Sequence, residues 1–456
     1  MSENVDIYEA DGLTTLELDQ VLPLTASVDT SKDPAGHLCI GGVDLCDLAK
    51  EYGTPLYVMD EQHIRTRLRE YQDGLSSEVE NVRVCYAIKS FACTRIAKIV
   101  DEEGCCMLVA SGGELALALK AGFPADRIIM HGSNKSRQEI QEALEAGISR
   151  VVADSFFDID NIEEIAASLG KSAQVLLRIR PGIVADTHSY IQTAQEDSKF
   201  GVSVASGEAM RAIKHILECP HIQLMGFQAH IGSQIFRLVG FDKEIESVMD
   251  FALWVREETG FEAKEIDLGG GLGIAYTLND RRTPVYDFTS RVARKLRDIC
   301  AANDFPMPLL AVEPGRSISG SAGVTIYTTG AIKEIPGIRT IVSVDGGMSD
   351  NIRSCLYGAK YEAVLANKAA QERTSLMTIA GKHCESGDIL IDRASLQEVE
   401  PGDILCIFST GAYCYTMSSN YNLICKPAVV FVKDGKASLA IRRQTYDDLF
   451  ICEVED

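Results

Sequence analysis

Apolar residues between positions 82 and 314 follow two alternating patterns. Eight short runs are apolar on both faces, as buried parallel strands are; they are RVCYAIK, CCMLVA, RIIMH, RVVAD, QVLLRIR, IQLMGFQAHI, KEIDLGGG and PLLAVEPG. Segments with helical spacing lie between them, at residues 94–103, 113–120, 136–146, 161–168, 207–217, 241–258 and 288–302. This alternation predicts parallel strands, and eight of them predict a closed (β/α)8 TIM-like barrel. A doubly wound open sheet is the structural alternative, although it is less natural with eight strands.

The pattern changes after about residue 316. The runs VTIYTTGAI, TIVSVDG, SLMTIAG, ILCIFST, PAVVFVK and KASLAIRR are short, rich in β-branched residues and separated by turn signals. A chain of 456 residues is too long for one ordinary core. We therefore expect a barrel at residues 51–318 and a second, β-rich domain at 319–456, which residues 1–50 join.

Composition and charge restrict the possible binding partners and the expected cellular compartment. The net charge of −22 argues against nucleic acid and anionic membranes as partners, and no apolar run is long enough to span a bilayer. The acidic N-terminus does not have the pattern of a signal peptide, and none of the 14 cysteines stands in a CxxC pair. We expect a cytoplasmic protein with reduced thiols. The eight histidines show no HExxH or paired metal spacing, so no metal is predicted.

Chemistry in a barrel gathers at the carboxyl ends of the strands. In this chain those ends carry Lys89, Ser111, His131, Asp154, Arg180, His230, Gly270 and Glu313. Lys89 directly follows the apolar run YAI. A buried ammonium is unfavourable unless it is paired with an acid, neutralised or part of a functional site. Alternatively, Lys89 simply follows the strand and reaches solvent, with no functional role. The convergence of polar residues at one end of the barrel favours a functional lysine.

Two glycine-rich stretches follow the last two barrel strands. They are DLGGGLGI, residues 267–274, and EPGRSISGSAG, residues 313–323. Glycine lets backbone N–H groups approach an anion, and barrel phosphate sites use the loops after strands seven and eight. The sequence has no GxxxxGK[ST] motif, which argues against a P-loop nucleotide site. A lysine, a phosphate site and the carboxylate of Glu313 together suit pyridoxal 5′-phosphate.

Ten stretches carry a resemblance to a known family: YAIKS, VASGGEL, HGSNKS, TAQEDSKFG, HIGSQ, DLGGGLGI, EPGRSISGSAG, VDGGMSDNIRSCLYG, CESGD and GAYCYTMSSNYN. In this order they resemble the fold-type III pyridoxal-phosphate decarboxylases, related in fold to alanine racemase and ornithine decarboxylase, and among them those that act on meso-diaminopimelate. The resemblance spans residues 86–422 and both expected domains. It implies a lyase that forms L-lysine and carbon dioxide in the last step of lysine biosynthesis, working as a homodimer with shared active sites.

The resemblance also implies roles for residues of the barrel. Lys89 would bind the cofactor as a Schiff base, His230 would stack on its ring, and Glu313 would bond the ring nitrogen. The phosphate and its surroundings would be held by Ser233, Gly270, Gly271, Gly273, Gly315 and Arg316.

Further roles are implied for the substrate and for the partner subunit. Arg316, Arg353 and Tyr357 would bind the distal carboxylate of the substrate, and Tyr413 would close over the cofactor. Cys384 and Glu385 would come from the partner subunit, the thiol as proton donor and the carboxylate for the distal amine. His131 and His383 are expected to be structural.

Two positions differ from the usual sequence of the family. Ala194 in TAQEDSKFG stands where the family usually has glycine, and the run YAI replaces YAV or YAS.

A related decarboxylase could act on ornithine, arginine, carboxynorspermidine or a carrier-bound glutamyl group, although Arg353 and Tyr357 weigh against a simple diamine precursor. A pyridoxal-phosphate-binding regulatory protein would need neither CESGD nor GAYCYT. An alanine racemase would place an arginine at the ring nitrogen, where this chain has Glu313.

Overall fold

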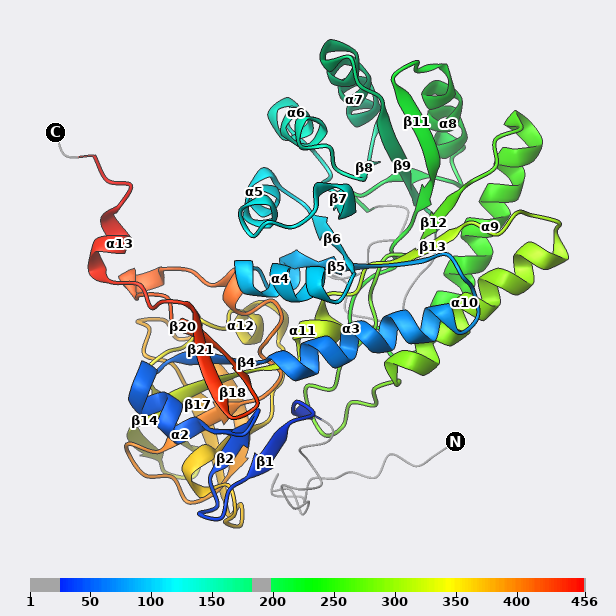
Figure 1. Ribbon diagram of the computed structural model, residues 1–456. Helices are drawn as coiled ribbons and strands as arrows, with labels where there is room; N and C mark the ends of the chain where they lie inside the picture. Colours follow the sequence, from blue (N-terminus) through cyan, green and yellow to red (C-terminus); the bar gives the residue numbers. More distant parts are fainter. Residues whose placement is uncertain (1–24, 183–197, 455–456) are drawn as a thin grey trace. The chain divides into compact units, whose positions relative to one another are not determined.

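The computed structural model describes residues 25–182 and 198–454 (Figure 1). The chain forms two compact units. One comprises Arg65–Gly273 and Thr283–Ser317, and the other comprises the described residues of Met1–Ile64, Ile274–Arg282 and Ile318–Asp456. We refer to them as the barrel unit and the β-rich unit. Ala194 lies outside the described residues.

The barrel unit contains a closed parallel sheet. Its strands are β5 (Val82–Ala87), β6 (Cys106–Val109), β7 (Ile128–Met130), β8 (Arg150–Ala153), β9 (Ala173–Arg180), β11 (Ile222–Gln228), β12 (Glu265–Asp267) and β13 (Leu309–Val312). They pair in the order β9-β11-β12-β13-β5-β6-β7-β8, and a pairing between β8 and β9 closes the ring. The short β10 (Val202–Ser203) adds to β9. The predicted eight-stranded barrel is therefore confirmed, and each of the eight predicted runs supplies one strand.

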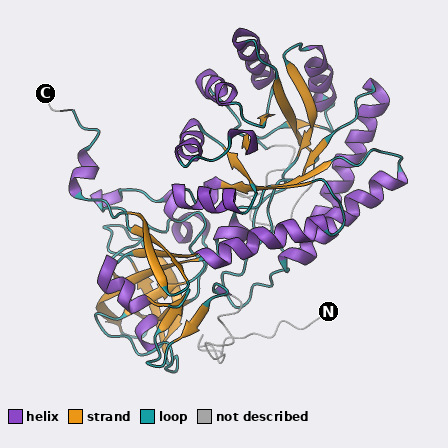
Figure 2. Cartoon of the chain, in the orientation of Figure 1, coloured by secondary structure: helices purple, strands orange, loops and turns teal. Residues whose placement is uncertain are grey.

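Helices connect the strands, as Figure 2 shows. They are α4 (Thr94–Glu102), α5 (Gly112–Lys120), α6 (Arg137–Ala146), α7 (Phe156–Leu169), α8 (Glu208–Glu218), α9 (Val239–Thr259) and α10 (Val285–Ala302), while α3 (Glu61–Ser76) precedes the first barrel strand. Serine side chains cap the first turns of α5, α6 and α7, which satisfies backbone N–H groups that have no partner within the helix. No helix in the described ranges combines the length and apolar character that crossing a membrane requires.

The β-rich unit is built on a branched sheet. Its main path runs β18 (Ile389–Leu396), β17 (Ser375–Ala380), β15 (Arg339–Val344), β14 (Gly323–Ile335), β4 (Leu56–Asp60), β20 (Ala428–Lys433) and β21 (Lys436–Ile441); β19 (Ile404–Ile407) pairs with β14 and with β16 (Ala363–Leu365). The six predicted strands are present, but β4, β16 and β18 were not predicted. Because β4 pairs with β14 and β20, the units separate between residues 64 and 65 rather than at residue 51.

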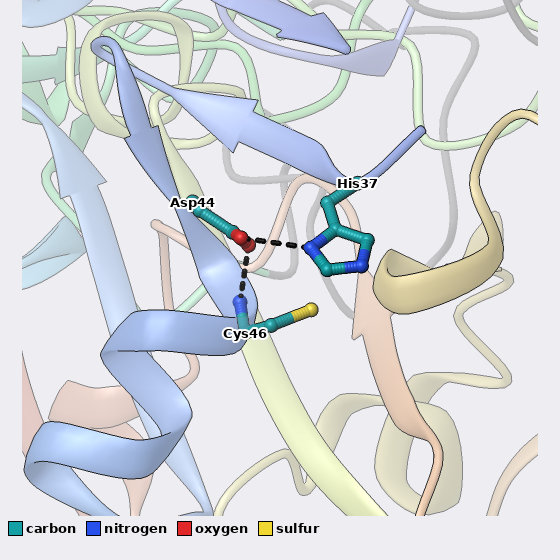
Figure 3. A group of neighbouring side chains, drawn as sticks. All are labelled: His37, Asp44 and Cys46. Carbon is teal, nitrogen blue, oxygen red and sulfur yellow. Dashed lines mark hydrogen bonds and ion pairs between the residues drawn. The ribbon is translucent and has the colours of Figure 1, made fainter. Parts of the chain in front are cut away.

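The N-terminal part of the β-rich unit forms a small sheet and a helix. The sheet consists of β1 (Thr30–Lys32), β2 (Leu38–Ile40) and β3 (Val43–Asp44), and it leads into α2 (Leu45–Tyr52). Asp44 joins the two, because one carboxylate oxygen accepts from the Cys46 N–H at 2.7 Å and the other lies 2.8 Å from His37 Nδ1 (Figure 3). His37, Asp44 and Cys46 are residue types that can bind a metal ion, but both carboxylate oxygens of Asp44 already contact groups within this unit. The apolar residues of β2 and α2 pack into the core of this unit.

Candidate active site

Lys89 lies two residues beyond the end of β5, in the short 3-10 helix η1 (Ile88–Ser90). Its side chain is exposed, whereas the neighbouring Ser90 is buried and its hydroxyl donates to the Ala87 carbonyl at 2.9 Å and to Tyr86 Oη at 3.1 Å. These hydrogen bonds fix the backbone that carries the lysine. The amine therefore stands free at the carboxyl end of the first barrel strand, where an aldehyde could reach it.

His230 follows β11, and its ring is held by the glycine-rich loop. The Gly270 N–H donates to His230 Nδ1 at 3.2 Å, so this nitrogen carries no proton. Burial lowers the pKa of His230 well below its usual value, and the positive charges of Lys89 and Arg178 lower it further. The imidazole is therefore neutral near neutral pH. A neutral, flat ring in a fixed orientation can stack on an aromatic cofactor.

Glu313 follows β13 and has an exposed side-chain fraction of only 7%. Gln228 Nε2 donates to its Oε2 at 3.1 Å, and His131 Nε2 lies 2.6 Å from its Oε1. Burial raises the pKa of Glu313 to about 7, although Arg178, a hydrogen bond with Asp267, Lys89 and Gln228 all lower it. Among the described residues, no donor is well aligned with Oε1. This buried acceptor fits the protonated ring nitrogen of pyridoxal phosphate.

The glycine-rich stretch after β12 packs directly against the loop after β13. The Glu313 N–H donates to the Gly269 carbonyl at 2.6 Å, and a Cβ placed on Gly270 would lie 2.3 Å from the Glu313 carbonyl oxygen. Gly271 has a φ of 118°, which L-residues rarely adopt. These positions therefore need glycine, and two loops from adjacent strands are held close together.

An arginine and a serine meet beside these loops. Arg316 begins α11 (Arg316–Ser319), and its Nε and Nη2 donate to Ser233 Oγ at 3.3 and 3.1 Å. Arg316 is 7% exposed, and Gly315 packs against Ala87 and Ser90 at the end of the first barrel strand. A hydroxyl, a guanidinium and nearby backbone N–H groups suit a phosphate.

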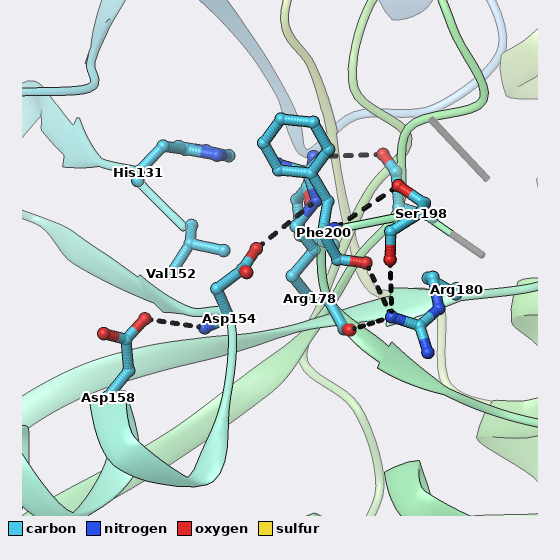
Figure 4. A network of polar contacts seen from close by, with 12 residues as sticks. His131, Val152, Asp154, Asp158, Arg178, Arg180, Ser198 and Phe200 are labelled. Carbon is cyan, nitrogen blue, oxygen red and sulfur yellow. Dashed lines mark hydrogen bonds and ion pairs between the residues drawn. The ribbon is translucent and has the colours of Figure 1, made fainter. Parts of the chain in front are cut away.

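Figure 4 shows the neighbouring network around β8 and β9. Asp154 Oδ1 lies 3.8 Å from Arg178 Nε, and the Arg178 guanidinium stacks 4.5 Å from the centre of the Phe200 ring. Arg180 instead binds the carbonyls of Ser198, Phe200 and Gly201 with one nitrogen. Arg180 thus anchors the backbone after residue 197.

Two of the polar strand ends named from the sequence have structural roles. Ser111 caps α5, with the Glu114 N–H donating to its hydroxyl at 3.2 Å, and Arg180 anchors a loop. The structure instead brings His131, Gln228 and Asp267 to Glu313. Sequence reasoning assigned no chemistry to these three residues, although a polar side chain at the end of a buried strand was a signal that could have identified them.

The β-rich unit holds Arg353 in an aromatic setting. Arg353 begins α12 (Arg353–Tyr357) and is 6% exposed. Its Nη1 donates to Tyr361 Oη at 2.6 Å, and its guanidinium lies 4.6 Å from the centre of the Tyr276 ring. A guanidinium held this way keeps a fixed plane, which suits two parallel hydrogen bonds to a carboxylate. Tyr357, at the other end of α12, is half-buried.

The CESGD loop exposes Cys384 and Glu385 on the β-rich unit. The Cys384 N–H donates to Asn422 Oδ1 at 2.8 Å, and Tyr421 Oη lies 3.5 Å from Glu385 Oε2. His383 is buried behind them and contacts Asp388, with 2.7 Å between Nδ1 and Oδ2. The GAYCYTMSSNYN stretch therefore fixes the loop that carries the thiol and the carboxylate.

Tyr413 belongs to the same stretch and has a φ of 58°. This conformation is unfavourable for a tyrosine, by roughly 1–3 kcal/mol, and such residues gather at ligand sites and active sites. The strain marks Tyr413 as a candidate for contact with a ligand.

The chain matches a known family over its barrel. The family described as "Pyridoxal-dependent decarboxylase, pyridoxal binding domain" matches residues 61–320. Together with the lysine, the buried glutamate and the glycine-rich loops, this match defines a pyridoxal-phosphate-dependent decarboxylase.

The similarity extends over both units. The chain is 47% identical to diaminopimelate decarboxylase of Bacillus subtilis, covering 91% of this chain and 94% of that protein. It is 42% identical to diaminopimelate decarboxylase of Mycobacterium tuberculosis, covering 96% and 100%. The solved structure of diaminopimelate decarboxylase from M. jannaschii with L-lysine has a TM-score of 0.89 and 33% identity, covering 95% of this chain and 99% of that one. The chain belongs to the diaminopimelate decarboxylase family.

Proposed function

We propose that this chain converts meso-2,6-diaminopimelate to L-lysine and carbon dioxide. The observation that carries the proposal is the 47% identity with a diaminopimelate decarboxylase over 91% of the chain, which includes the β-rich unit. A barrel match alone would support only a pyridoxal-dependent decarboxylase. In lysine biosynthesis this reaction is the last step.

The barrel unit supplies the groups that hold the cofactor. When bound, pyridoxal phosphate supplies a ring that accepts electrons from a breaking bond. Lys89 would be the amine for covalent attachment, and the neutral ring of His230 would stack on one face of the cofactor. Glu313 as a carboxylate would hold the proton on the ring nitrogen, which would keep the ring an effective electron acceptor. The residues that would hold the phosphate and its surroundings are Ser233, Gly270, Gly271, Gly273, Gly315 and Arg316.

The β-rich unit supplies the groups that select and protonate the substrate. Arg353 and Tyr357 would bind the distal carboxylate together with Arg316 of the barrel unit, and Tyr413 would close over the cofactor. A substrate without the distal carboxylate would offer the buried Arg353 guanidinium no charged acceptor beside its hydrogen bond to Tyr361, which is a basis for rejection. Cys384 of the partner subunit would be the proton donor to the α-carbon, and Glu385 of the partner subunit would bind the distal ammonium.

This arrangement requires a homodimer. The exposure of Cys384 and Glu385 on a loop that the chain itself holds in place supports this proposal, because a donor group must be presented to a second subunit. A cytoplasmic location is part of the same proposal. All 14 cysteines are free thiols in this structure, which agrees with a reducing compartment.

A turnover assay tests the reaction. The purified protein should be yellow, borohydride should bleach the colour, and meso-diaminopimelate should yield L-lysine and carbon dioxide. Ornithine should be turned over poorly, and Lys89→Ala should lose both colour and turnover. Faster turnover of ornithine, arginine or carboxynorspermidine would identify a related decarboxylase instead. Colour without turnover of any of these amino acids would favour a regulatory protein that binds the cofactor.

A mixing experiment tests the shared site. Lys89→Ala and Cys384→Ala should each be inactive alone. Mixed and allowed to exchange subunits, they should regain part of the activity, because some mixed dimers contain one site with both residues intact. If mixing restores nothing although mixed dimers form, the thiol and the lysine act within one chain.

A further inference from the structure

His131 contacts the acid that the proposed function assigns to the ring nitrogen. The residue directly follows β7, and its N–H donates to the Val109 carbonyl at 2.8 Å, which fixes its backbone. Its Nε2 lies 2.6 Å from Glu313 Oε1, and each side chain is 7% exposed. The two atoms are close enough for a hydrogen bond, although their orientation in this structure is not that of one.

The short separation favours a proton between these two atoms. Two lone pairs at this distance repel, so either Nε2–H donates to a carboxylate or a carboxylic acid donates to Nε2. Burial lowers the pKa of His131 well below its usual value, and the cations Arg178, Lys135 and Lys89 lower it further while Asp154 opposes them. The imidazole is therefore neutral and carries one proton. Donation from Nε2–H leaves Glu313 as the anion that the pyridinium proton requires.

Two other buried acids near Glu313 have raised pKa values, which favours their neutral forms. Burial raises the pKa of Asp267 well above its usual value, and the charge of Glu313 raises it further. Burial also raises the pKa of Glu244, again with contributions from Asp267 and Glu313. Glu313 differs because it has the Gln228 amide, a hydrogen bond with Asp267 and the charges of Arg178 and Lys89 in its favour. One negative charge is thus concentrated on the acid that has donors.

We propose that His131 is a positioning residue for the decarboxylation, which donates from Nε2 to Glu313 Oε1 and holds this carboxylate ionised and oriented toward the cofactor ring nitrogen. An oxygen has two lone pairs, so Oε1 can accept from His131 and from the ring nitrogen together. The inference rests on the proposed function. It adds His131 at the end of β7, which the sequence analysis expected to have only a structural role.

The groups that face this pair come from several elements. Those whose charges or dipoles act on His131 or Glu313 are Lys89, Lys135, Asp154, Arg178, Gln228 and Asp267. Arg178 acts on both members, so it lowers the pKa of the histidine and of the acid together. Removing the His131 donor therefore leaves Glu313 with its other partners but should raise its pKa.

The test uses the holoenzyme reconstituted with pyridoxal phosphate labelled with ¹⁵N in the ring. The ¹⁵N chemical shift reports whether the ring nitrogen is protonated. In His131→Phe, which keeps a ring but has no donor, the nitrogen should lose its proton at a lower pH than in the wild type. The kcat should fall roughly 10- to 100-fold, the loss expected for one hydrogen bond to a charged group, with a smaller change in KM. His131→Gln, which restores an N–H donor, should recover most of both.

A matched control is His63→Phe. His63 is also fully buried and contacts Ser321 Oγ through Nε2 at 3.0 Å, but it lies in the β-rich unit. It should change the ring-nitrogen signal little. If His131→Phe titrates as the wild type does, the proposal is overturned. Labelling the histidines of the wild type gives a reading that needs no variant, because the proposal requires a proton on His131 Nε2, and its absence there overturns the assignment.

These outcomes are distinct from failure of the proposed function. If the wild type binds no cofactor, or if Glu313→Gln leaves the ring-nitrogen signal unchanged, the assignment of the site itself fails. If Glu313→Gln changes the signal and His131→Phe does not, only the role of His131 fails.

Discussion

One methyl group at Gly270 should disturb the site more than the fold. In Gly270→Ala the new Cβ would lie 2.3 Å from the Glu313 carbonyl oxygen and 3.1 Å from its carbonyl carbon. Both are backbone atoms, so no side-chain rotation relieves the contact. The loops must separate by about 1 Å to reach an ordinary van der Waals distance. Overpacking of this kind destabilises a fold by about 1–3 kcal/mol.

The same displacement moves a catalytic group. The Glu313 N–H is bonded to the Gly269 carbonyl, so the loop that carries the carboxylate must shift when the glycine loop shifts. A displacement of about 1 Å in an active site can lower the rate about 100-fold. We therefore expect kcat to fall by about two orders of magnitude and the cofactor to bind more weakly, while the protein still folds.

The assay compares kcat, the cofactor Kd and the urea midpoint with those of Gly113→Ala. Gly113 lies in α5, and the nearest atom to a Cβ there is Ser111 Oγ at 3.8 Å. Alanine is favoured over glycine in a helix by about 1 kcal/mol, so this control should keep its activity and lose no stability. A Gly270→Ala enzyme with wild-type kcat and Kd would show that the two loops do not hold the carboxylate in place.

Two further predictions concern pH and the CESGD loop. Burial raises the pKa of Glu313 from 4.5 to about 7. Between these pH values the folded apoenzyme therefore binds more protons than the unfolded chain does. The free energy of unfolding should fall as pH rises through this window, by about 3 kcal/mol for this group. Urea unfolding of the apoenzyme at several pH values should show this slope, and Glu313→Gln should reduce it; an equal slope in the variant contradicts the assignment. Asn422 has a φ of 54°, so Asn422→Gly keeps the backbone but removes the acceptor for the Cys384 N–H, and kcat should fall up to about 10-fold. Asn422→Asp retains an acceptor and should stay near the wild type, whereas equal losses in both variants would show that the hydrogen bond is not the cause.

The barrel was predictable because its pattern is local. Each strand is a short apolar run and each helix has an apolar face, so the eight strands could be read one by one. The strand β4 was missed for a non-local reason: Leu56–Asp60 reads as another buried strand, and only its pairing with β14 and β20 assigns it to the β-rich unit. The position of a strand in the sequence does not show which sheet the strand joins.

The candidate site divides in the same way. Lys89 and Glu313 could be identified because a polar residue ends an apolar run at the active end of a barrel. The contact of His131 with Glu313 could not, because the residues are 182 positions apart in the sequence and come from strands β7 and β13 that are not neighbours in the sheet. The motif resemblance supplied roles for known positions, but it assigned none to this histidine.

Burial explains why one of the three buried acids at this end of the barrel carries the negative charge. In water Glu244, Asp267 and Glu313 would each be ionised near neutral pH. In the barrel, desolvation penalises each charge, and repulsion among the three acids penalises a second one further. The charge therefore settles where donors and cations are densest, which is Glu313. A pyridinium proton facing this carboxylate would then be stabilised by a full charge in a site with little water to screen it, so the same burial that makes the isolated acid weak makes its ion pair with the cofactor strong.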